Sequence, residues 1–188
     1  MQILKFARKI WRDLSVDGRG GIDVRVLGVD PGMAITGYAV VSEVDQTLTL
    51  YRYGVIRTPS SMPLPRRLYQ IHKGISDLLD EYQPRAVSVE RLFFNKNVRT
   101  AMTVGQARGV VLLAAGARDL PVLEYTPPQV KAAVTGHGAA TKEQVQLMVQ
   151  SLLRLVEIPT PDDAADAIAV AVCSLHRWGW DEKLGAGR

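Results

Sequence analysis

Five short segments of the chain either alternate hydrophobic and polar residues or keep hydrophobic residues together between turn signals. We predict that they are β-strands, at residues 24–29, 35–42, 48–57, 86–89 and 122–125. Only short turns join the first three strands, which favours an antiparallel meander. A long helical segment precedes the fourth strand, and we expect this strand to lie beside the first one and parallel to it.

Longer segments carry hydrophobic residues three and four positions apart, as helices do. Two such segments cover residues 64–82 and 98–118. Three more helices are predicted to begin at Thr126, Thr141 and Thr160, where each hydroxyl side chain can cap the first turn.

The element order is β-β-β-α-β-α-β-α-α-α, which predicts an α/β domain over residues 24–178. Its sheet would be five-stranded and mixed, with three antiparallel strands followed by two parallel ones, and flanked by helices. We expect the helix from Thr141 to end near residue 156 and the last helix near residue 178. Residues 179–188 then form a C-terminal tail.

Residues 1–23 have a pattern of their own. Hydrophobic residues recur at helical spacing with lysines and arginines between them, which predicts a basic amphipathic helix. Such a helix could lie on a membrane, a protein partner or DNA. Glycines end the pattern before the first strand, and we interpret the segment as a dispensable, flexible leader.

The composition is that of one globular domain. The chain has 188 residues, 47% of them hydrophobic and 22% charged, which argues against disorder. The single cysteine, Cys173, excludes a disulfide framework and a cysteine-based zinc site, and it fits a reducing compartment. The longest hydrophobic stretch, residues 109–117, is too short to span a bilayer, and the N-terminus lacks a signal-peptide pattern. We therefore expect a cytoplasmic protein with no membrane association.

Charge is distributed unevenly along the chain, whose formal net charge is +4. Residues 85–142 contain eight basic and three acidic side chains, whereas residues 143–182 contain seven acidic and two basic ones. A basic middle beside an acidic cluster suits a protein that holds a polyanion near metal-binding carboxylates. Charge alone, however, favours the simpler interpretation of a solvated mixed surface.

Four carboxylates stand where folding would bring them together. Asp30 and Glu90 follow the first and fourth strands, so parallel neighbours would present both at the carboxyl edge of the sheet. Asp163 and Asp166 share one face of the last helix. An all-oxygen ligand set selects hard ions such as Mg²⁺ or Mn²⁺, and two such ions can assist phosphodiester hydrolysis.

Each carboxylate also has a simpler interpretation. Asp30 could be only a turn residue before Pro31, and Asp163 could only complete a capping box. Glu90 could form an ion pair with Arg91. Asp166 is harder to dismiss because the alanines around it predict burial, and a buried carboxylate needs a partner or a metal.

Short motifs occur in a characteristic order between residues 24 and 177. They are LGVDPG at 27–32 with TGY at 36–38, VE at 89–90 leading into Phe93 and KN at 96–97, GQARG at 105–109, VK at 130–131 and DAADA at 163–167. In this order and spacing they resemble the RuvC family of bacterial Holliday junction resolvases. The GQARG and DAADA motifs are the most specific of them.

The resemblance implies a ribonuclease-H-like fold and a Mg²⁺-dependent endonuclease that resolves four-way DNA junctions in recombination and repair. The family's catalytic, metal-binding carboxylates fall on four residues: Asp30, Glu90, Asp163 and Asp166. Two Mg²⁺ ions per site are implied, with Mn²⁺ able to substitute. A catalytic lysine falls on Lys131, where a cation could neutralise phosphate charge.

The resemblance also implies DNA contacts and partners. Phe93 falls on an aromatic side chain that contacts the junction, and Lys142 falls on a basic position suited to the DNA backbone. The remaining expected DNA-binding residues are basic: Arg91, Lys96, Arg99 and Arg108. A homodimer and the RuvA–RuvB branch-migration complex are the implied partners. The family usually has other residues at Arg91, Phe94 and Asn95, which leaves base preference near the cut open.

Three other functions remain open at this point. The Asp-Pro-Gly turn with Gly37 also fits the phosphate loop of actin-like ATPases, although the chain has no second glycine-rich loop. A junction-binding protein that does not cleave is a second possibility, and a related nuclease with another DNA or RNA substrate is a third. His137 and His176 are isolated, and we assign them no catalytic role.

Overall fold

The structure is a computed structural model that describes residues 23–91 and 98–183. The predicted N-terminal leader therefore lies outside the described residues, apart from Asp23. Phe93, Phe94 and Lys96 lie outside them too, as does the side chain of Arg99.

Five strands form one mixed sheet in the order β3-β2-β1-β4-β5. The first three strands pair antiparallel, and β1–β4 and β4–β5 pair parallel. This arrangement confirms both the meander and the predicted adjacency of the first and fourth strands. The strands are β1 Val24–Asp30, β2 Ile35–Val44, β3 Thr47–Arg57, β4 Ala86–Glu90 and β5 Val122–Tyr125.

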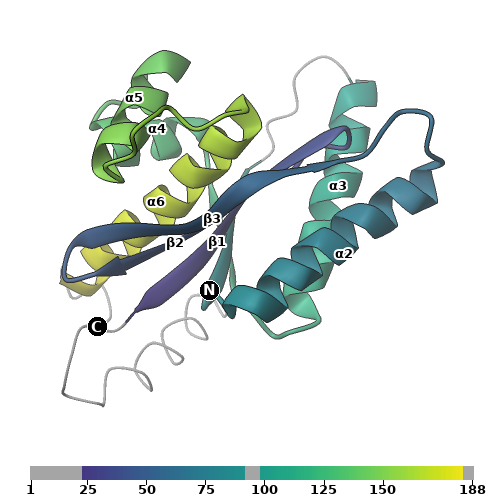
Figure 1. Ribbon diagram of the computed structural model, residues 1–188, viewed down its shortest axis with the longest axis horizontal. Helices are drawn as coiled ribbons and strands as arrows, with labels where there is room; N and C mark the ends of the chain where they lie inside the picture. The colour runs from purple at the N-terminus through teal and green to yellow at the C-terminus, as the bar shows by residue number, and fades with distance from the viewer. Residues whose placement is uncertain (1–22, 92–97, 184–188) are drawn as a thin grey trace.

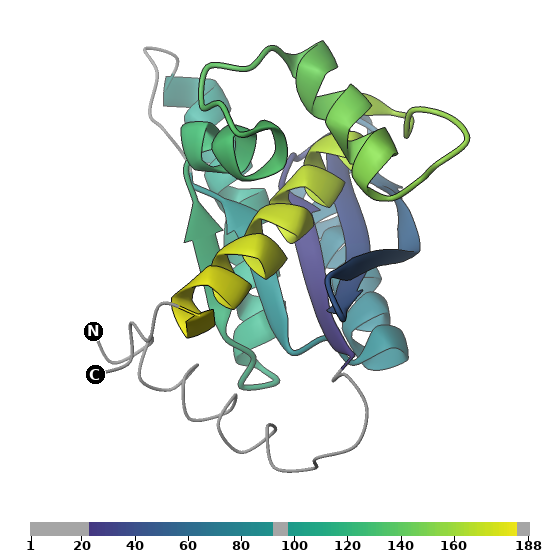
Figure 2. The ribbon, with the colours of Figure 1, turned by 90° about the vertical axis from the view of Figure 1, so that its left-hand side faces the viewer.

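Helices cover both faces of the sheet, so the domain has three layers (Figure 1). Helices α2 and α3 lie on one face, and α6 crosses the other with α4 and α5 beside it (Figure 2). The helices are α2 Leu64–Tyr82, α3 Val98–Gly116, α4 Pro127–Thr135, α5 Lys142–Leu152 and α6 Asp162–Lys183. Within the described ranges, none of the helices has the length and hydrophobicity needed to cross a membrane.

The capping signals identify two helix starts correctly. The hydroxyls of Thr126 and Thr141 each accept a hydrogen bond from the backbone N–H of the third helical residue, and the side chain of the glutamine there accepts one from the backbone N–H of the cap. Two helix ends were predicted wrongly. Helix α5 ends at Leu152 rather than near residue 156, because Arg154 adopts a left-handed φ of 52°. Helix α6 continues to Lys183, so the predicted boundary at residue 178 falls inside it.

The close packing of α6 on the sheet depends on small residues. Ala164, Ala165, Ala167 and Ala171 are all buried. A Cβ at Gly28 in β1 would lie 2.2 Å from the carbonyl oxygen of Ala167 and 2.8 Å from Cβ of Ala171. Glycine on the strand and alanine on the helix therefore let the two backbones approach, which carries the first turn of α6 to the carboxyl end of β1.

Candidate active site

Asp30 and Glu90 end the two central strands of the sheet. Val29 of β1 pairs with Val89 of β4 in parallel register, so the next residue of each strand emerges at the same edge. Both carboxylates are partly buried and line one cavity of about 250 Å³. The order of the strands along the chain predicts this meeting, and the parallel register of β1 with β4 produces it.

Helices α4, α5 and α6 form the rest of the cavity wall. Asp166 contributes a third carboxylate, and Lys131 and Lys142 contribute two cationic side chains. The remaining wall is largely apolar: Pro127, Val130, Val145, Ala169 and Val170. The cavity thus combines three acidic and two basic groups with a largely apolar wall.

Burial and mutual repulsion perturb the carboxylates. The pKa of Asp30 is raised from 3.8 to about 7, first by burial and then by the charges of Asp166, Glu90 and Asp163, while Lys142 opposes the shift. The pKa of Glu90 is raised by burial and by Asp166, with Lys131 acting against it. Full ionisation of this set is therefore unfavourable unless more positive charge is brought in.

Lys142 already supplies part of that charge. Its Nζ lies 3.0 Å from Asp166 and 3.2 Å from Asp162. Burial raises the pKa of Asp166, and the hydrogen bond from Lys142 is the largest opposing influence. The sequence places Lys142 at a helix start but gives no signal that it pairs across 24 residues with Asp166.

Asp163 stands apart from the other three carboxylates. It lies in the first turn of α6 and raises the pKa of Asp30, but it does not line the cavity. Across the described ranges, no three acidic, histidine or cysteine side chains are already close enough together to hold a metal ion. Asp30, Glu90 and Asp166 therefore line one cavity without forming a ready-made metal site, and Lys142 is the cation paired with Asp166 there.

A side-chain network that the sequence analysis missed holds the turn after Asp30. Arg67 on α2 donates to the carbonyl oxygens of Met33 at 3.1 Å and Thr58 at 3.2 Å, and to the Thr58 hydroxyl at 2.9 Å. The Thr58 hydroxyl in turn donates to the Met33 carbonyl. Arg67 therefore holds the loop that follows β1, through its hydrogen bond to Met33. No local spacing pattern signals this role.

The other predicted basic residues differ in their surroundings. Arg91 is exposed and pairs with Glu124 at 3.8 Å, so the simpler interpretation of a Glu90–Arg91 ion pair is not what the structure shows. Arg108 is largely buried and also pairs with Glu124. His176 Nδ1 lies 3.0 Å from the carbonyl oxygen of Ala133, in a structural contact away from the cavity lining.

The five-stranded mixed sheet between its helices defines the class of the protein, a ribonuclease-H-like fold. Comparison with known proteins identifies the family. Residues 26–174 match the family model described as crossover junction endodeoxyribonuclease RuvC. This match covers most of the chain, and the protein belongs to the RuvC family.

Individual relatives agree with this assignment. The chain is 56% identical over 166 residues to the crossover junction endodeoxyribonuclease RuvC of Moorella thermoacetica, covering 87% of this chain and 99% of that protein. It is 53% identical over 155 residues to the RuvC of Syntrophomonas wolfei, covering 82% and 90%. Among solved structures, T. thermophilus RuvC in complex with a Holliday junction substrate matches with a TM-score of 0.79 and 38% identity, covering 82% of this chain and 94% of that one.

Proposed function

We propose that this protein is a structure-selective endonuclease that resolves four-way DNA junctions by metal-dependent phosphodiester hydrolysis. The observation that carries the proposal is the cavity in which Asp30, Glu90 and Asp166 meet Lys131 and Lys142. Relatives that match this chain over nearly their whole length are named crossover junction endodeoxyribonucleases.

The residues present fit a divalent metal by their chemistry. All candidate ligands are carboxylate oxygens, which favour Mg²⁺ and allow Mn²⁺. The raised pKa of Asp30 and the ion pair of Asp166 with Lys142 both indicate a demand for positive charge. We assign the metal to Asp30, Glu90 and Asp166, with Asp163 completing the set, and expect two ions. Bound there, the ions supply the charge that stabilises the attacking and leaving oxygens of an in-line displacement.

The protein's own side chains have separate tasks in this scheme. Lys131 faces Glu90 across the cavity and neutralises phosphate charge as it builds up in the transition state. Lys142, which is paired with Asp166, would be available to the DNA backbone if a bound metal took over the charge of that carboxylate. Hydrolysis in this arrangement leaves a 5′-phosphate and a 3′-hydroxyl.

Isosteric amides test the proposal directly. Asp30→Asn and Glu90→Gln should abolish cleavage of a four-way junction with Mg²⁺ yet retain junction binding. Asp77→Asn is the matched control, because Asp77 is an exposed carboxylate paired with Lys73 on α2. Retained cleavage in the first two variants would refute the assignment. Three-way, flap and linear DNA should be cut poorly by the wild type, and equal cleavage of linear DNA would indicate a different nuclease.

We also propose a homodimer that works with the RuvA–RuvB branch-migration complex. A four-way junction needs two matched cuts, and a second copy related by a twofold axis supplies the second site. One face of α3 suits that contact, since Met102 and Leu113 are 65% and 63% exposed there. A Cβ at Gly105 or Gly109 on the same face would meet nothing within 4 Å, so a second backbone can approach closely.

A further inference from the structure

An ion pair ties α3 to the end of β5 beside Glu90. Arg108 on α3 donates from Nη2 to Oε1 of Glu124, and its side chain is only 18% exposed. The other oxygen of Glu124 lies 3.8 Å from Nε of Arg91, whose side chain is 57% exposed. Glu124 is therefore shared between a largely buried arginine on a helix and an exposed arginine that directly follows Glu90.

The strand register connects this ion pair to the cavity. In the parallel pairing of β4 with β5, Glu124 lies opposite Val89 and Tyr125 opposite Glu90. The backbone N–H of Arg91 donates to the carbonyl oxygen of Tyr125 at 2.7 Å. A shift of β5 at Glu124 would therefore move the end of β4, from which Glu90 enters the cavity.

The surroundings of Arg108 do not suit a phosphate contact. Its charge is already matched by Glu124, and its Nε is buried with no hydrogen-bond partner among the described residues. Moving Arg108 to DNA would leave Glu124, an exposed residue, with only the looser contact to Arg91. Only the arginine of this pair is largely buried, so the cost of breaking it lies between that of an exposed and that of a buried ion pair.

We propose that Arg108 is a positioning residue, which together with Glu124 fixes the carboxyl ends of β4 and β5 so that Glu90 stays in the cavity. This assigns the arginine of the GQARG motif a role other than binding DNA. The expected loss of cleavage rests on the proposed function. The expected displacement of Glu90 is measured separately, by Mn²⁺ affinity.

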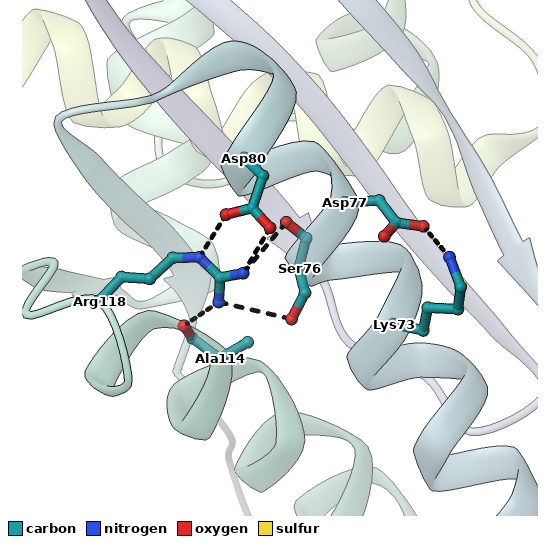
Figure 3. A network of polar contacts seen from close by, with 6 residues as sticks. All are labelled: Lys73, Ser76, Asp77, Asp80, Ala114 and Arg118. Atoms are coloured by element: carbon teal, nitrogen blue, oxygen red, sulfur yellow. Dashed lines mark hydrogen bonds and ion pairs between the residues drawn. The ribbon is translucent and has the colours of Figure 1, made fainter.

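The chain offers a matched control at the opposite ends of the same strands. Arg118, two residues beyond α3, donates from Nε and Nη2 to the two carboxylate oxygens of Asp80 on α2, both at 2.8 Å (Figure 3). This pair is bidentate and also joins two elements, and the Arg118 side chain is 27% exposed. It lies before the starts of β4 and β5, whereas Glu90 lies at the far end.

The experiment compares Arg108→Gln, Glu124→Gln and their double variant with Arg118→Gln. Junction affinity is measured in EDTA, cleavage in a single turnover at saturating junction, and Mn²⁺ affinity by calorimetry on DNA-free protein. We expect the three Arg108–Glu124 variants to bind junctions within about twofold of wild type but to cleave at least ~10-fold more slowly, the double variant no worse than either single one. Their Mn²⁺ affinity should fall at least about threefold because Glu90 is displaced.

Arg118→Gln should lower the melting temperature but leave cleavage and Mn²⁺ affinity unchanged. The proposal is overturned if Arg108→Gln weakens junction binding in EDTA at least ~10-fold with an unchanged saturated rate, which marks a DNA contact. It is equally overturned if Arg108→Gln behaves like Arg118→Gln in every assay. If wild-type protein does not cleave junctions, the proposed function is wrong, and the Mn²⁺ affinities then decide the positioning role alone.

Discussion

Gly37 lies directly against the backbone of Asp163. A Cβ at Gly37 would stand 1.9 Å from the Asp163 carbonyl oxygen and 2.5 Å from its carbonyl carbon. Gly37 is also the residue of β2 that pairs with Asp30. Gly37 therefore sets how closely the first turn of α6, which contains Asp162 and Asp163, approaches the end of β1.

Gly37→Ala should push α6 away from the sheet. Since the clash is with backbone atoms, no side-chain rotation relieves it, and we expect a loss of about 1–3 kcal/mol in the free energy of unfolding together with strongly reduced cleavage. Urea denaturation and a junction-cleavage assay measure both. Gly116→Ala at the end of α3 is the control, because a Cβ there meets nothing within 4 Å. Equal effects of the two substitutions would contradict the packing argument.

Most of the fold can be predicted from the sequence, because the strands show clear patterns of hydrophobic and polar residues. Alternation and turn signals predict all five strands, and the long helix before Ala86 predicts the parallel pairing with β1. The helix ends are less predictable. The end of α5 depends on a left-handed residue at Arg154, a position where neither glycine nor asparagine signals the turn.

The site is predictable only where strand topology positions it. Asp30 and Glu90 end parallel neighbours, so their meeting follows from the order of the strands. The contacts of Arg67 with Met33 and of Arg108 with Glu124 join residues 34 and 16 positions apart, respectively. Such side-chain pairs arise from tertiary packing and leave no periodic trace in the sequence.

Asp30→Asn should stabilise the metal-free protein in a pH-dependent way. The pKa of Asp30 is raised from 3.8 to about 7 in the folded state by burial and by Asp166, Glu90 and Asp163, against Lys142. The wild-type protein therefore loses stability as pH rises between these two values, and no further loss follows above pH 7. Asp30→Asn should therefore be no more stable than wild type below pH 3.8, and more stable by at most about 4 kcal/mol above pH 7.

Denaturation in EDTA at pH 4 to 8.5 (about four to six points) measures this difference. Added Mn²⁺ should narrow it, because metal binding stabilises only the wild-type carboxylate set. A stability difference that stays constant across the whole pH range would show that folding does not raise the pKa of Asp30.

Lys131→Met should separate binding from chemistry. Lys131 lines the cavity and lowers the pKa of Glu90, which places its charge near the carboxylates rather than on the outer surface. Losing one cation aimed at the transition state costs roughly 10²-fold in rate. We expect that loss in single-turnover cleavage, with junction affinity within about threefold of wild type. Lys131→Arg, which keeps the charge, should recover part of the rate, and a variant that only weakens binding would contradict the assignment.

Arg67→Met should loosen the turn that follows Asp30. The substitution removes the three hydrogen bonds to Met33 and Thr58 but keeps a side chain of similar length. Each such bond is worth about 0.5–1.5 kcal/mol, so we expect a loss of roughly 1.5–4.5 kcal/mol in the free energy of unfolding. Arg66→Met, at an exposed neighbouring position, is the control. Unchanged stability and cleavage in Arg67→Met would show that the turn holds without this network.

Leu113→Arg should convert the proposed dimer into a monomer. Leu113 is 63% exposed on the open face of α3, and a twofold contact would place two new arginines near each other across the axis. Light scattering at matched concentrations measures the mass, and Leu147→Arg on α5, where leucine is 54% exposed, controls for surface charge. The monomeric variant should nick junctions on one strand without producing paired cuts, because each active site then acts alone. A wild-type protein that is monomeric even on a junction would eliminate the dimer, and a dimeric Leu113→Arg would place the contact elsewhere.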